Sequence, residues 1–71
     1  MRTHDEHVLA ATRAGLQALD LCGSVERALK EYCDDEGLET NGTARLAICA
    51  AARIRIEYEW LIAKAAAKVT P

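Results

Sequence analysis

Residues 37–42 are the strongest interruption in a sequence that otherwise favours the α-helix. They read Gly-Leu-Glu-Thr-Asn-Gly, and glycine and asparagine are turn formers. On both sides the chain is rich in alanine, leucine, arginine, glutamate and lysine, which have high helix propensity. We therefore predict one all-α domain over residues 1–71, with helices at about 4–36 and 43–69 folded back on each other as an antiparallel hairpin.

A seam of apolar and small residues runs through the first predicted helix, with alternating steps of three and four. Because the seam continues through Gly23 and Ser24, we predict one long helix with a kink there. The alternative is two helices, with Gly23 just past the end of the first and Ser24 as the N-cap of the second. The seam consists of Val8, Ala11, Gly15, Ala18, Cys22, Val25, Leu29 and Tyr32.

The second predicted helix is apolar on two opposite faces, so one partner helix cannot cover it. A chain of 71 residues also buries only about 60% of the surface that its unfolded form exposes. We therefore predict that the hairpin homodimerises into a four-helix assembly. One face carries Ala47, Ala51, Ile54, Tyr58, Leu61 and Ala65, and the other carries Cys49, Ala52, Ile56, Trp60, Ala63 and Ala67.

Residues 53–60 alternate strictly between polar and apolar side chains, which is also typical of a half-buried strand. The alanine-rich sequence on both sides favours helix, and we predict helix here. The face that contains Trp60 is the best candidate for an interface, because tryptophan, tyrosine and arginine dominate interface energetics. It is predicted as the dimer seam, or otherwise as the site that grips a foreign protein. The candidate residues are Cys49, Ala52, Arg53, Ile56, Tyr58, Trp60 and Ala63.

Three acidic residues, Asp34, Asp35 and Glu36, lie at the end of the first predicted helix, where the helix dipole disfavours negative charge. We call them the acidic knuckle, and they are a candidate docking site for a basic protein surface. The alternative is that Arg45, across the turn, compensates for them. Residues 1–42 carry four basic and nine acidic side chains, and residues 43–71 carry five basic and two acidic. Opposite charges of this kind suit two segments folded back on each other, or head-to-tail pairing between subunits.

No arrangement of residues in the sequence indicates catalysis, and we predict that the protein is not an enzyme. Cys22, Cys33 and Cys49 contain no C-x-x-C pair and are interpreted as small core residues rather than as disulfides or zinc ligands. His4 and His7 lack further metal ligands at a fixed spacing, so we expect no metal and no cofactor. With no signal segment and no run of 18 apolar residues, we expect a cytoplasmic protein that does not enter a membrane.

These features together predict a small protein that acts stoichiometrically by binding another protein as a regulator, adaptor or inhibitor, such as an antagonist of phage or mobile-element origin. Two alternatives belong to other classes. An oligomer with a small-molecule site between subunits would use Arg53, Arg55 and Tyr58. A weak DNA-binding regulator would use the basic residues of the second helix, but the net charge of −2 disfavours nucleic acid as a partner.

Overall fold

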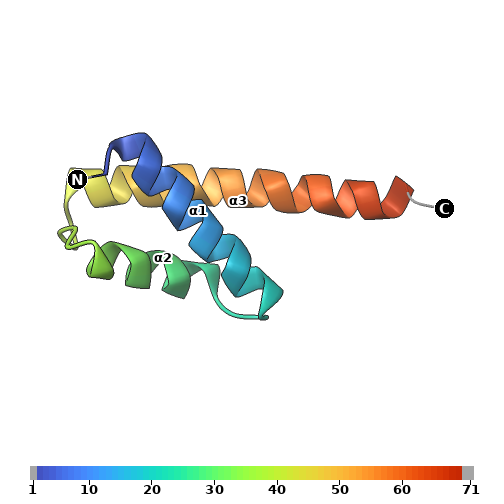
Figure 1. Ribbon diagram of the computed structural model, residues 1–71, viewed down its shortest axis with the longest axis horizontal. Helices are drawn as coiled ribbons and strands as arrows, with labels where there is room; N and C mark the ends of the chain where they lie inside the picture. The colour runs from blue at the N-terminus through green and yellow to red at the C-terminus, as the bar shows by residue number, and fades with distance from the viewer. Residues whose placement is uncertain (1, 70–71) are drawn as a thin grey trace.

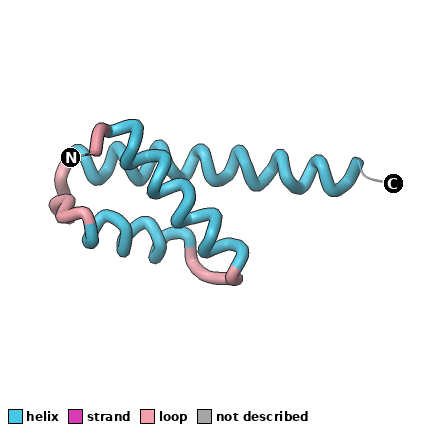
Figure 2. Tube along the Cα trace, viewed as in Figure 1, coloured by secondary structure: helices cyan, strands magenta, loops and turns pink. Residues whose placement is uncertain are grey.

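The computed structural model describes residues 2–69, which form three helices: α1 (His4–Asp20), α2 (Val25–Asp35) and α3 (Thr43–Val69) (Figure 1). No strand occurs among these residues, so the all-α class is confirmed and residues 53–60 are helical (Figure 2). The predicted helix at 43–69 is confirmed. The two-helix hairpin is not, because the chain turns sharply after α1.

The first predicted helix is split, so the prediction of one continuous helix is wrong and the alternative of two helices with Ser24 as N-cap is confirmed, although the residue just past the C-cap of the first helix is Cys22 rather than Gly23. Cys22 adopts a left-handed backbone conformation with φ of 58°. Its N–H donates to the carbonyl of Leu19 at 3.0 Å, and the N–H of Gly23 donates to the carbonyl of Ala18 at 2.7 Å. This is the Schellman pattern that ends helices. Ser24 then begins α2, because its hydroxyl accepts a hydrogen bond from the N–H of Arg27 at 3.2 Å.

The other helix ends also have local causes. Thr3 and Glu6 form a reciprocal capping box at the start of α1. Gly37 ends α2 with φ of 73°, and the N–H of Leu38 donates to the carbonyl of Cys33 at 3.0 Å. The predicted turn at 37–42 therefore lies between α2 and α3, as expected.

The core forms where α1 packs against both other helices (Figure 1). Gly15 of α1 lies against Ile56 of α3, and a Cβ at Gly15 would overlap the Cδ1 atom of Ile56. A larger residue at position 15 would therefore require the side chain of Ile56 to shift. The buried apolar residues are Val8 and Ala11 from α1, Leu29 and Cys33 from α2, and Ile48, Cys49, Ala52 and Ile56 from α3.

The C-terminal half of α3 extends well beyond the other two helices (Figures 1 and 2). Every residue from Glu57 to Ala67 is exposed. The molecule measures 46 × 21 × 18 Å and its radius of gyration is 13.2 Å. A compact chain of this length has a radius of gyration of about 11 Å. The projecting half of α3 accounts for the elongated shape.

Candidate interaction surface

An apolar stripe runs along the face of α3 that points away from α1 and α2. Its large members are exposed: Ile54 by 68%, Tyr58 by 57% and Leu61 by 60%. The spacing alternates between four and three residues, as in the seam of a coiled coil. We call it the outer stripe, and it consists of Ala47, Ala51, Ile54, Tyr58, Leu61 and Ala65. All of these except the half-buried Ala51 are exposed.

The opposite face of α3 does not match the predicted interface. Cys49, Ala52 and Ile56 are buried within the single chain, where α1 and α2 cover them. Their prediction as part of a seam with a second chain is therefore wrong. The reason is the break after α1, because it folds α2 back so that two helices share this inner face. The other candidate residues, Arg53, Tyr58, Trp60 and Ala63, are all exposed.

Trp60 lies at the edge of a groove where the inner face of α3 leaves the other helices. The groove has a volume of about 260 Å³, and its lining includes Leu19, Val25 and Ile56. Trp60 itself is 43% exposed, and the ammonium of Lys64 lies 4.0 Å from the centre of its ring. An apolar groove with a tryptophan wall suits the insertion of an apolar side chain.

Arg53 closes one side of this groove through an ion pair with Glu26 of α2. The two side chains form two parallel hydrogen bonds, and the distance from Nη2 of Arg53 to Oε2 of Glu26 is 2.8 Å. This hydrogen bonding lowers the pKa of Glu26. Arg55 and Tyr58 line a different depression. The three residues predicted to border one ligand site therefore do not come together within a single chain.

The acidic knuckle is largely engaged within the chain. Asp34 accepts hydrogen bonds from Lys30 and from Arg45, each at 2.8 Å, and these bonds lower its pKa. Arg45 is only 8% exposed and also donates to the carbonyl of Leu38 at 3.3 Å. The predicted compensation by Arg45 is confirmed for Asp34, and this contact joins the oppositely charged halves of the chain. Glu36 lies 3.8 Å from Nδ1 of His7.

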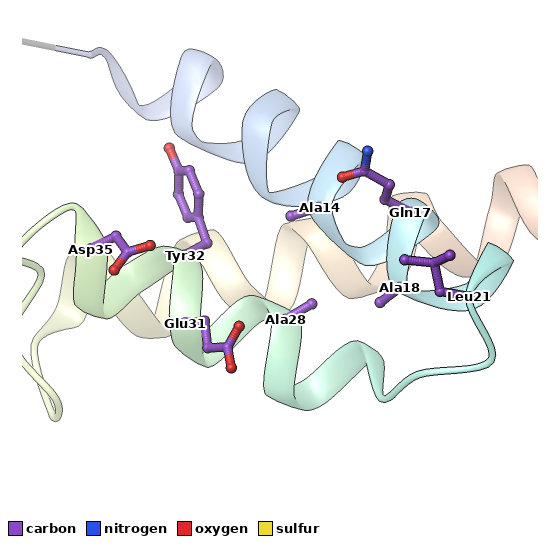
Figure 3. Close-up of a pocket in the computed structure, with 8 residues that line it drawn as sticks. All are labelled: Ala14, Gln17, Ala18, Leu21, Ala28, Glu31, Tyr32 and Asp35. Carbon is purple, nitrogen blue, oxygen red and sulfur yellow. The ribbon is translucent and has the colours of Figure 1, made fainter.

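Asp35, the third residue of the knuckle, lies at the rim of a depression of about 330 Å³ between α1 and α2 (Figure 3). Its other lining residues are Ala14, Gln17, Ala18, Leu21, Ala28, Glu31 and Tyr32. Alanines from both helices lie along it, and Glu31 adds a second carboxylate (Figure 3). No side chain in this lining is a histidine, cysteine, serine or lysine.

Two of the three cysteines lie side by side in the core. The Sγ atoms of Cys33 and Cys49 are 3.5 Å apart and buried, so their prediction as core residues is confirmed. Burial, with a smaller effect from the Cys49 thiol, raises the pKa of Cys33 to about 11, which keeps it protonated at neutral pH. Cys22 is exposed, and its prediction as a core residue is wrong. The sequence contained no signal for the contact between Cys33 and Cys49, because it joins residues on separate helices.

The histidines and the cysteines do not form a metal site. Nδ1 of His7 lies 2.8 Å from the hydroxyl of Tyr32, within hydrogen-bonding distance. Within residues 2–69, no group of three histidine, cysteine, aspartate or glutamate side chains is arranged to hold a metal ion.

Comparison with known protein families, with characterised proteins and with solved structures finds no match to this chain. Among the helices described, none is both long and apolar enough to cross a membrane.

Proposed function

We propose that this protein is a cytoplasmic, non-enzymatic interaction module that homodimerises through the outer stripe of α3 and binds another protein stoichiometrically, as a regulator, adaptor or inhibitor. One observation carries the proposal. A coiled-coil spacing of apolar residues continues along α3 without any helix of the same chain against it. Because each chain has three helices, a dimer would contain six helices rather than the four predicted from the sequence.

The solvent-exposed area of the chain is larger than that of a compact monomer, which supports an interface with another chain. The chain exposes 5276 Å². A compact monomer of this size exposes about 4,300 Å². The excess of roughly 1,000 Å² is close to the area of about 800 Å² that each partner buries in an interface of standard size. Pairing along α3 would therefore give this chain the exposed surface of an ordinary small protein.

The groove beside Trp60 is the surface proposed for a second, different protein. Its apolar lining lies outside the outer stripe, and Glu57, which also lines it, lies beside the stripe. Two observations disfavour DNA as that partner. Arg45 is engaged with Asp34 and Arg53 with Glu26, which leaves few free cations on α3 for phosphate contacts.

The proposal is tested by measuring solution mass with light scattering over a dilution series. We expect the wild-type chain to be a dimer and Leu61→Glu to be monomeric, because the substitution places a charge in the centre of the stripe. Leu46→Glu is the matched control, since Leu46 is 61% exposed on the same helix but lies outside the stripe. This control should remain dimeric. A wild-type monomer at high micromolar concentration would overturn the homodimer.

A further inference from the structure

The charges beside the outer stripe differ on its two sides, and this difference bears on how two copies would pair. In coiled-coil notation, Tyr58 and Ala65 occupy a positions, and Ile54 and Leu61 occupy d positions. One flank, the g positions, then carries Glu57 and Lys64. The other flank, the e positions, carries Arg55 and Ile62. Residues at these flanking positions set partner choice and orientation in coiled coils.

Antiparallel pairing brings residues of the same flank together. When the two-fold axis passes between residues 59 and 60, Tyr58 of one copy packs against Leu61 of the other, and Ile54 packs against Ala65. On the g flank, Glu57 then faces Lys64 of the second copy. The two-fold axis repeats this contact, so the pairing contains two ion pairs between opposite charges.

Parallel pairing has no such complementarity. It places the g position of one copy beside the e position of the other, so that Glu57 meets Ile62 and Ala50 meets Arg55. It also stacks Tyr58 on its own symmetry mate. No ion pair forms across the interface, and each charge would be partly desolvated without a partner.

Within the chain, Glu57 and Lys64 are available for this role. Glu57 has no ion-pair partner among the side chains of residues 2–67. Lys64 contacts the ring of Trp60 and is likewise without an ion pair in that part of the chain. Both side chains are exposed on the half of α3 that projects from the three-helix body.

We propose that two copies of this chain pair antiparallel along α3, with Glu57 of each copy against Lys64 of the other. This inference rests on the homodimer proposed above and specifies its geometry. In this arrangement the two three-helix bodies lie at opposite ends of the dimer. Each body covers the inner face of its own α3, so the bodies do not obstruct the pairing.

The first experiment reverses the charges. Glu57→Lys alone and Lys64→Glu alone should each raise the dissociation constant about ten- to thirtyfold, because two attractions become two repulsions. The double variant Glu57→Lys/Lys64→Glu should return to within about threefold of wild type. An equimolar mixture of the two single variants should form the heterodimer in preference to either homodimer. Glu59→Lys is the matched control, since Glu59 lies off both flanks, and its dissociation constant should not change.

The second experiment reads the orientation directly, in a Cys22→Ser chain that lacks the exposed native thiol. A mixture of Ile54→Cys and Ala65→Cys chains should give a mixed disulfide under mild oxidation. Cross-linking of Ile54→Cys chains to each other would overturn the antiparallel pairing while leaving the proposed homodimer intact. A monomeric wild-type chain would overturn both proposals, so the two failures can be told apart.

Discussion

Replacing Gly15 with alanine tests the contact that places α1 on α3. The new methyl group would stabilise the helix by about 0.5–1 kcal/mol through propensity alone. It would, however, overlap the Cδ1 atom of Ile56, which is 3% exposed and has little room to move. Forcing an extra methyl group into a packed core costs about 1–3 kcal/mol. We therefore expect Gly15→Ala to lower the free energy of unfolding by about 1 kcal/mol.

A second substitution removes the atom that is in the way. Ile56→Val deletes Cδ1 and by itself should cost about 0.5–1.5 kcal/mol, because it leaves a cavity. In the double variant the alanine methyl group occupies that space, so its stability should lie within about 0.5 kcal/mol of wild type. The double variant should therefore be more stable than the sum of the two single effects predicts. Ile54→Val on the exposed face of α3 is the control, and its effect should simply add to that of Gly15→Ala.

Urea denaturation followed by circular dichroism measures the wild type, the three single variants and the two double variants, Gly15→Ala/Ile56→Val and Gly15→Ala/Ile54→Val. All six chains are compared at one fixed protein concentration, because a dimer gains stability with concentration. If Gly15→Ala stabilised the protein by its full helix propensity, or showed no coupling with Ile56→Val, the close packing of α1 on α3 at this point would be refuted.

Three further predictions concern single groups. Cys22→Gly should raise the free energy of unfolding by about 0.5–1 kcal/mol in thermal denaturation, because glycine adopts the left-handed conformation of this residue without strain. Asp34→Asn should lower the Tm, because it removes the carboxylate that binds Lys30 and Arg45. Hydrogen bonds from these two residues lower the pKa of Asp34, so the wild type should also lose stability as acid protonates this carboxylate, and the variant should not show this loss. The pKa of the Cys33 thiol is about 9 in the unfolded chain and about 11 in the folded chain, so the free energy of unfolding of the wild type should fall by up to about 2 kcal/mol between pH 9 and 11. Cys33→Ala should show a smaller loss over this range.

The helical class and the extent of α3 follow from local sequence, but the end of α1 does not. The seam of the first predicted helix is continuous because both α1 and α2 are amphipathic and their patterns happen to remain in register through Cys22 and Val25. Periodicity alone cannot distinguish one straight helix from two helices that turn back on each other. The deciding signal was Ser24, an N-cap. Gly23 was a second signal for the helix end, but the left-handed residue is its neighbour Cys22, which the sequence pattern placed within the seam.

The two apolar faces of α3 were visible in the sequence, but not which face the chain covers itself. That choice depends on contacts between distant residues, such as Gly15 against Ile56 and Cys33 against Cys49. The charge difference between the halves of the chain was more informative, because opposite charges do meet across α2 and α3. The ion pair between Asp34 and Arg45 is the clearest example, and it engages a residue that had been predicted to dock a partner.

The break at Cys22 also explains why α3 is left without cover. A continuous helix over residues 4–36 would be about 50 Å long and could lie along the whole of α3, whose 27 residues span about 40 Å. Once the chain turns at Cys22, α1 and α2 both pack on the inner face near the start of α3, and neither buries any of residues 57–67. The exposure of α3 on its inner as well as its outer face over residues 57–67 therefore results from the cap that ends α1. The strained backbone of Cys22 thus sets how much of α3 the other two helices cover, and it leaves exposed the half of α3 that we propose pairs with a second copy.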